Sequence, residues 1–172
     1  MKTQKFQIEP AQSNIDWVGK KVTGAHNGTI AIKSGSLTLS NGKLAGGRFI
    51  IDTTSIRILD VTDATMNAQF AGHLASDNFF SSAKFPEAVF DITSVSGDHI
   101  EGKLTIKGIT HPIGFDAEIN VHGDTLTATG KLVVDRTKYN MKFRSGNFFK
   151  DLGDTLIYND FDLSVSITAK TY

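Results

Sequence analysis

Apolar and polar residues alternate through most of this chain, and this period of two restricts the fold more than any other feature. In residues 100–107 the even positions are apolar or glycine and the odd positions are polar. Segments 113–119 and 161–168 alternate in the same way. Because successive side chains of a β-strand point to opposite faces, each segment predicts a strand with one buried and one solvated face.

Turn-forming residues separate these segments at hairpin spacing. The strongest hairpin signal is Asn41-Gly42, since a type I′ turn needs positive φ at both central positions. The pair Gly46-Gly47 predicts a bend or bulge in the next strand. Together the segments and turns predict about eight antiparallel strands. Such strands can bury their apolar faces in a sandwich or in an up-and-down barrel, and the short connections favour the barrel. The sequence therefore predicts one all-β domain, an eight-stranded antiparallel barrel that is filled by side chains or holds one small ligand.

The stretch 62–86 departs from the alternation and predicts a short helix followed by a loop. Thr62 or Asp63 can cap the helix start with a side-chain oxygen. The loop, residues 76–86, carries three phenylalanines among turn formers and is called the aromatic loop below. The helix would cap the barrel mouth, either as a lid over a ligand or as a simple cover on a core. Three apolar residues share one helix face: Met66, Phe70 and Leu74.

Composition excludes several classes of protein. Lys plus Arg equals Asp plus Glu, 18 against 18, so no net charge favours nucleic acid. No apolar run is long enough to span a bilayer, and the absence of cysteine excludes disulfides and thiolate sites. The first residues lack the apolar region of an export signal. The chain as written is thus expected in the cytoplasm, and in the periplasm if a methionine has replaced a natural export signal.

No motif predicts catalysis, a metal or a cofactor. The histidines lack metal-ligand spacing, and no nucleophile elbow or phosphate loop is present. Asp135-Arg136 predicts a local ion pair that braces a strand-to-loop turn. His73, late in the predicted helix, could serve the structure or meet a ligand head group. The twelve phenylalanines, which carry no polar group, suit either an ordinary core or the lining of an apolar cavity.

Several blocks of sequence resemble the YceI-like family, bacterial lipocalin-like proteins associated with polyisoprenoid binding. Residues 73–80 and 84–86 resemble the family's His-Leu…Phe-Phe…Lys-Tyr-Pro signature, with Phe85 in place of tyrosine. Residues 102–112 resemble its Gly-x-Leu-Thr-x-x-Gly-x-Thr-x-Pro turn, and residues 135–139 its Asp-Arg-x-x-Phe/Tyr step.

The resemblance runs from about Phe6 to Ala169, although Gln12 stands where the family often has histidine. It implies an eight-stranded lipocalin-like barrel with a helix at one end and an elongated apolar channel. It also implies binding of long isoprenoids or fatty amphiphiles, frequent export to the periplasm, and in some members a homodimer. We therefore expect a non-enzymatic carrier or store of a long-chain isoprenoid or related lipid. Two alternatives remain: an enzyme acting on a bound isoprenoid, and a stress-related structural module with a packed barrel.

The predicted ligand-binding residues fall into three groups. The barrel interior would contribute Trp17, Phe49, Phe90, Leu104, Ile106 and Phe115. The cover would contribute Phe70, Leu74, Phe79 and Phe80, with His26 and His73 as polar candidates near the head group. Four residues of the irregular stretch 135–153 are further candidates for the channel lining: Met141, Phe143, Phe148 and Phe149.

Overall fold

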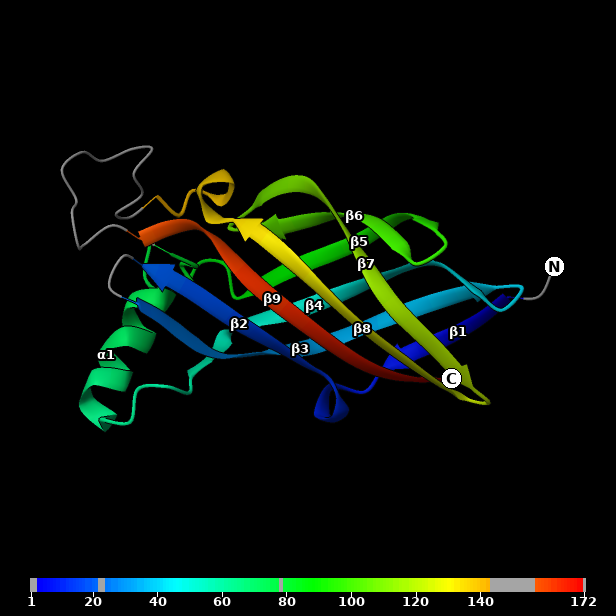
Figure 1. Ribbon diagram of the computed structural model, residues 1–172, viewed down its shortest axis with the longest axis horizontal. Coiled ribbons are helices and arrows are strands. Elements are labelled where there is room, and N and C mark those ends of the chain that lie inside the picture. The colour runs from blue at the N-terminus through cyan, green and yellow to red at the C-terminus, as the bar shows by residue number, and fades with distance from the viewer. Residues whose placement is uncertain (1–2, 22–23, 78, 143–156, 172) are drawn as a thin grey trace.

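The alternating segments pair edge to edge until the sheet closes on itself, and one α-helix lies at one end of the resulting barrel (Figure 1). The computed structural model describes residues 3–21, 24–77, 79–142 and 157–171. In chain order the elements are β1 (Thr3–Ile8), η1 (Pro10–Gln12), β2 (Asn14–Lys21), β3 (Gly24–Ser40), β4 (Lys43–Ile58), α1 (Ala64–Ala75), β5 (Glu87–Ser96), β6 (His99–Ile106), β7 (Ile109–His122), β8 (Thr125–Asp135), η2 (Arg136–Tyr139) and β9 (Ile157–Thr171).

The nine described strands fill eight positions around the barrel, because β1 and β2 share one position. β1 pairs with residues 36–40 of β3 and with the end of β9. β2 pairs with the first part of β3 and with the earlier part of β9. Pro10 begins the 3₁₀ helix η1 that separates the two strands. Since β3 also pairs with β4 and every pairing is antiparallel, the predicted eight-stranded antiparallel barrel is confirmed.

The β3–β4 hairpin forms at the predicted turn. Asn41 and Gly42 have φ of 54° and 79°, the positive values that a type I′ turn requires. The predicted irregularity beside Gly46 is also present, since the pairing register shifts between Thr38 and Leu39. The first strand of this hairpin is long and continuous, since β3 runs from Gly24 to Ser40.

The helix begins and ends at polar side chains. The Asp63 carboxylate accepts a hydrogen bond from the Met66 N–H at 2.8 Å, as predicted for a cap. At the other end the Ser76 hydroxyl donates to the His73 carbonyl at 2.5 Å.

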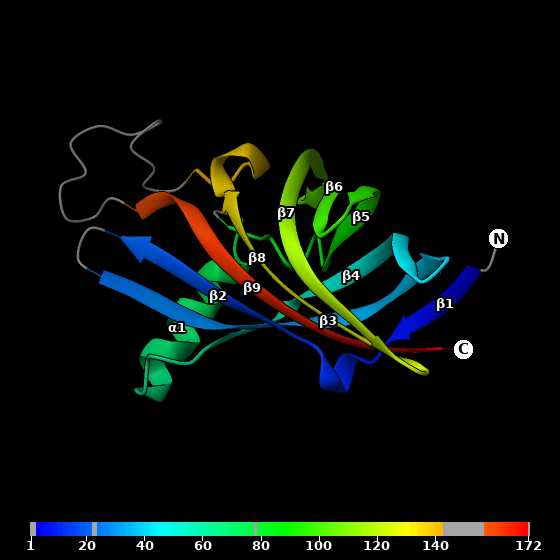
Figure 2. The ribbon, with the colours of Figure 1, turned by 45° about the vertical axis from the view of Figure 1, so that its right-hand side comes forward.

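α1 packs against β4 and buries none of its residues fully. Figures 1 and 2 place it at the end of the barrel opposite both chain termini. Within the described residues, no helix is long and apolar enough to cross a membrane.

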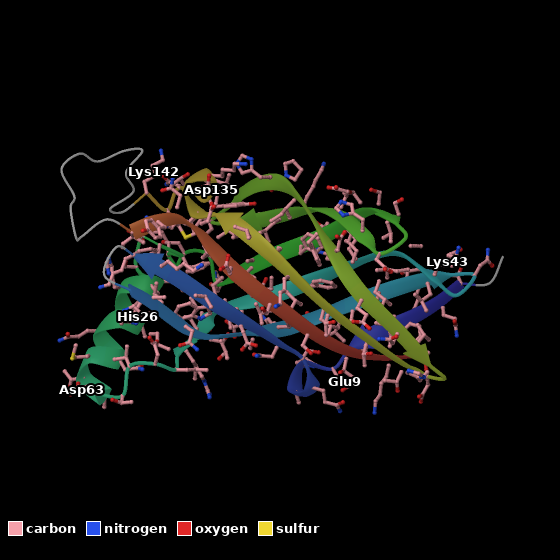
Figure 3. All side chains as sticks on the ribbon, in the orientation of Figure 1. Glu9, His26, Lys43, Asp63, Asp135 and Lys142 are labelled. Atoms are coloured by element: carbon pink, nitrogen blue, oxygen red, sulfur yellow. The ribbon has the colours of Figure 1, made fainter. Side chains whose placement is uncertain are left out.

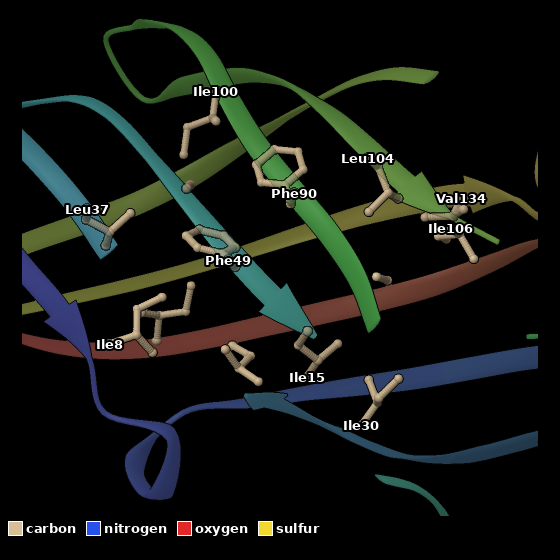
Figure 4. Close-up of a cluster of buried hydrophobic side chains, with 14 of the residues drawn as sticks. Ile8, Ile15, Ile30, Leu37, Phe49, Phe90, Ile100, Leu104, Ile106 and Val134 are labelled. Atoms are coloured by element: carbon tan, nitrogen blue, oxygen red, sulfur yellow. The ribbon is translucent and has the colours of Figure 1, made fainter. Parts of the chain in front are cut away.

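Buried hydrophobic side chains of several strands meet in the barrel interior, and Figure 4 shows part of this core. Three phenylalanine rings cross it: Phe90 lies 5.6 Å from Phe49 and 5.7 Å from Phe115, measured between ring centroids. Gly102 makes room for the Phe90 ring, because a Cβ added there would contact this ring and lie 2.5 Å from the Asp91 carbonyl oxygen. Beyond the rings the core continues with Phe6, Ile8, Leu37, Leu39, Leu126 and Ala169.

The contact at Gly102 predicts a stability difference between two glycine substitutions. Gly102→Ala should lower the free energy of unfolding by about 1–3 kcal/mol, because the added methyl group overpacks the Phe90 site. Gly46→Ala is the matched control on another strand, since nothing lies within 4 Å of the Cβ it adds. It should stay within about 0.5 kcal/mol of the parent protein. Urea denaturation measures both, and equal stabilities would contradict the assigned packing.

Candidate ligand-binding cavity

The half of the barrel next to α1 is hollow. It contains a cavity of about 610 Å³ that is open to the outside, whereas the pocket in the opposite half, beside Phe49 and Phe115, measures about 20 Å³. The larger volume falls within the range of roughly 300–1,000 Å³ typical of small-molecule sites. The interior is therefore packed at one end and open to a ligand at the other.

Inward-facing residues of several strands form an apolar wall around this cavity. Trp17 turns its ring toward it while its indole Nε1–H donates to the Thr29 carbonyl, 3.3 Å between N and O. The wall offers a ligand mainly hydrocarbon surface. The other apolar wall residues on strands include Ile15, Ile30, Ile51, Ile56, Ala88, Leu104, Ile106, Phe161 and Leu163.

The helix α1 and the aromatic loop together cover the cavity and are called the cover below. Their apolar contribution to the lining comes from Met66, Phe70, Leu74, Phe79 and Phe80. Backbone hydrogen bonds fold the loop back under the helix, since the N–H of Phe80 donates to the Leu74 carbonyl at 3.0 Å. The buried Ser82 hydroxyl donates to the Thr53 carbonyl on β4, 2.9 Å away. The serines of this loop therefore serve its structure.

Lys107 fastens the cover to the barrel. It lies in the β6–β7 turn with φ of 55°, and its Nζ donates to the carbonyls of Asp77 at 2.8 Å and Asn140 at 3.0 Å. Burial lowers the pKa of this lysine. The alternation of residues 100–107 predicted that the Lys107 side chain faces solvent. This prediction is wrong, because β6 ends at Ile106 and the Lys107 side chain is buried in the turn that follows.

Arg136 is a second buried cation, and it lines the cavity. Its guanidinium donates to three backbone carbonyls: Nε to Tyr158 at 3.0 Å, Nη1 to Met141 at 2.5 Å and Nη2 to Ile157 at 3.0 Å. Burial lowers the pKa of Arg136 to about 10. The predicted ion pair with Asp135 is absent from the salt bridges of the described residues. The Asp135 carboxylate instead caps η2 by accepting from the Thr137 N–H and hydroxyl.

Both predicted head-group histidines lie beside the cavity, and both also make structural contacts. His26 Nδ1 is 2.8 Å from an Asp60 carboxylate oxygen, and its ring meets the Phe70 ring edge-on at 4.8 Å. The His73 ring packs edge-on against Phe79 at 5.0 Å. Figure 3 shows His26 at the α1 end of the barrel, with Lys43 at the opposite end.

The structure separates the predicted ligand residues into two sets. The cavity is lined by Trp17, His26, Phe70, His73, Leu74, Phe79, Phe80, Leu104 and Ile106, and also by the further candidate Met141. Phe49, Phe90 and Phe115 face inward as predicted, but they do not line this cavity, because their rings pack against one another in the filled half. Phe143, Phe148 and Phe149 lie outside the described residues.

The sequence reasoning missed a group of polar lining residues on three neighbouring elements. Lys20 and Lys21 end β2, Tyr158 and Asp160 begin β9, and Arg136 begins η2. Strand alternation assigns a residue to a face only within a regular strand. It gives no signal at strand ends, where β2 shows a shift of register between Gly19 and Lys21.

Comparison with known proteins agrees with this architecture. Residues 6–169 match the model of the YceI-like domain. The chain belongs to the YceI-like family. Protein YceI of Escherichia coli O17:K52:H18 is 31% identical over 120 residues, which are 67% of this chain and 61% of that protein. The Salmonella arizonae protein YceI is 33% identical over 106 residues, covering 59% and 55% of the two chains. The matched region thus spans about three fifths of these relatives' length.

Two solved structures share the fold of this YceI-like chain. Burkholderia cenocepacia BcnA has a TM-score of 0.73 at 21% identity, over 95% of this chain and 99% of its own. A polyisoprenoid binding domain from Saccharophagus degradans, implicated in plant cell wall breakdown, has a TM-score of 0.70 at 12% identity, over 99% and 100% of the two chains. At these identities the likeness shows the fold alone.

Because Lys107 joins the cover to the barrel, replacing its side chain should cause a measurable loss of stability. Lys107→Met should lower the free energy of unfolding by about 1–3 kcal/mol, because two carbonyls lose a charged donor. Amide hydrogen exchange should become faster at the N–H groups of Phe80 and Ser82, which hold the loop under the helix. Lys103→Met, an exposed position on β6, should change neither quantity. Unaltered exchange in Lys107→Met would contradict the fastening role.

Proposed function

We propose that this YceI-like protein binds a long-chain isoprenoid or related amphiphilic lipid in the hollow half of its barrel and carries or stores it. The supporting observation is the apolar cavity of about 610 Å³ beneath the cover. Membership of the family and the fold shared with a polyisoprenoid binding domain support the same class of ligand. A cavity of this size also favours binding over the alternative of a barrel packed solid.

The wall and the ligand class match in chemistry. A prenyl tail offers no hydrogen bonds, so its affinity must come from removing its surface from water, worth about 0.8 kcal/mol per buried CH₂ before the cost of ordering the chain. The side chains of Trp17, Leu104 and Phe161 present this kind of surface. The polar residues of the lining gather near the barrel end, where a head group would lie.

The cover provides a route of entry. α1 buries no residue fully and packs against β4, so moving it exposes less apolar surface than opening the barrel wall.

Binding without catalysis fits the lining, in which His26 is held by Asp60 and Arg136 by three carbonyls. The compartment and the homodimer remain predictions.

Trp17 offers a direct readout of binding. Lipid-stripped protein should show tryptophan emission at shorter wavelength than a solvated indole, because Trp17 is partly buried in the wall. Titration with a long-chain prenyl alcohol should shift the emission and saturate near one ligand per chain. An emission spectrum that saturating lipid leaves unchanged would remove Trp17 from the ligand site.

Two phenylalanine substitutions separate the cavity wall from the packed core. Phe80 lines the cavity, so Phe80→Ala should weaken binding of the prenyl alcohol about tenfold by removing contact area. Phe115 packs in the filled half, so Phe115→Ala should leave affinity unchanged while destabilising the fold by about 3 kcal/mol.

Isothermal titration calorimetry on both folded variants measures the affinities, and urea denaturation measures the stabilities. If Phe115→Ala loses lipid binding and Phe80→Ala keeps it, the ligand occupies the other half of the barrel.

A further inference from the structure

The inward-facing residues of β5 pass from the cavity into the filled half of the barrel. Ala88 lines the cavity, and Ile92 lines the small pocket of the filled half. Phe90 lies between these two on the same face of the strand, since side chains two residues apart point the same way. It is buried and belongs to the lining of neither space. Figure 4 shows the same order on β6, where Ile100 of the small pocket and Leu104 of the cavity lie on either side of Phe90.

Two other strands change from cavity to small pocket in the same way. On β4, Ile51 lines the cavity and Phe49 lines the small pocket, and Phe49 is the cross-strand partner of Phe90. On β9, which lies four strands from β5 in the pairing order, Leu163 lines the cavity and Val165 lines the small pocket. The boundary between the two spaces therefore extends across the barrel.

The Phe90 ring is held at this boundary by its neighbours. Its centroid lies 5.6 Å from that of Phe49 and 5.7 Å from that of Phe115. It also packs over Gly102, where an added Cβ would contact the ring. On the cavity side its cross-strand partner is Leu104. A tail that enters from the α1 end would thus meet Leu104 and then the Phe90 ring.

The volume of the cavity sets the length of tail that it can hold. A dry cavity of about 150 Å³ holds one benzene molecule, which corresponds to about 25 Å³ per carbon atom. By this measure a volume of about 610 Å³ holds about 24 carbons, or about five isoprene units. The pocket of about 20 Å³ beyond Phe90 is too small for a single carbon. The filled half therefore offers a tail no further room while the ring is in place.

We propose that Phe90 is the floor of the lipid site and limits the buried tail to about five isoprene units. This rests on the proposed function and adds to it the length of the ligand and the residue that determines it. Each carbon buried in an apolar site tightens binding about fourfold before the cost of ordering the chain. Further isoprene units stay outside the barrel and add little to the affinity.

The test measures affinity against tail length in lipid-stripped protein. Prenyl alcohols of three to eight isoprene units are compared by calorimetry at one low, fixed detergent concentration. Up to five units, each added unit should tighten binding at least about tenfold, because it is buried. From six units onward the affinity should level off.

Two substitutions should move the levelling-off point in opposite directions. Phe90→Ala removes a ring of about the volume of one isoprene unit, so the affinity should rise through a sixth unit. This variant can fail to fold, and Ala88→Phe therefore provides a second test. Its ring enters existing cavity space, so the affinity should level off at about four units. Phe115→Ala is the matched control, since it removes a ring behind Phe90 and should leave the point at about five units.

The contrary outcomes differ in meaning. If no prenyl alcohol binds, the proposed function itself fails. If the affinity of the parent protein rises steadily to eight units, the tail passes Phe90, and the length limit is wrong although lipid binding stands. A levelling-off point that Ala88→Phe leaves unmoved overturns the placement of the floor. A Phe115→Ala protein that gains affinity through a sixth unit would overturn it as well.

Discussion

The contact of three phenylalanine rings inside the barrel determines where a ligand can lie. Phe49, Phe90 and Phe115 occupy the space that closure of the sheet leaves open, and the absence of a side chain at Gly102 leaves room for the Phe90 ring. Beyond these rings the core is continuous, and on the α1 side the cavity begins. Because one half of the barrel supplies the dense packing, the other half can remain hollow without loss of a stable core.

The cover depends on buried polar contacts more than on apolar burial. Lys107 donates to carbonyls of the aromatic loop and of the segment after η2, and Ser82 joins the loop to β4. These bonds fix the loop that carries Phe79 and Phe80, whereas the helix itself buries no residue fully. Under the proposed function, the helix is the part of the cover that moves to admit a lipid.

Much of this fold follows from local sequence. Period-two alternation predicted the strands and the inward orientation of Phe90, Phe115 and Leu104, since it reports which face a residue occupies. The alternation does not report how far along the barrel axis a residue lies. Inward-facing residues of the filled half therefore could not be distinguished from those of the cavity wall. Lys107 and Arg136 were misread for another reason. Their partners, such as Asp77 and Tyr158, are distant in sequence, and only the closed barrel brings them together.

The central claim is that the hollow half of the barrel holds a long-chain lipid, and the most direct measurement is the identity of what the protein retains from cells. Protein purified without detergent should be extracted with organic solvent. Quantitative mass spectrometry of the extract then gives the molar ratio of lipid to protein. The account predicts a long-chain isoprenoid or related amphiphile at close to one molecule per chain. A folded protein that yields no such lipid, and takes none up when incubated with a cell lipid extract, would contradict it.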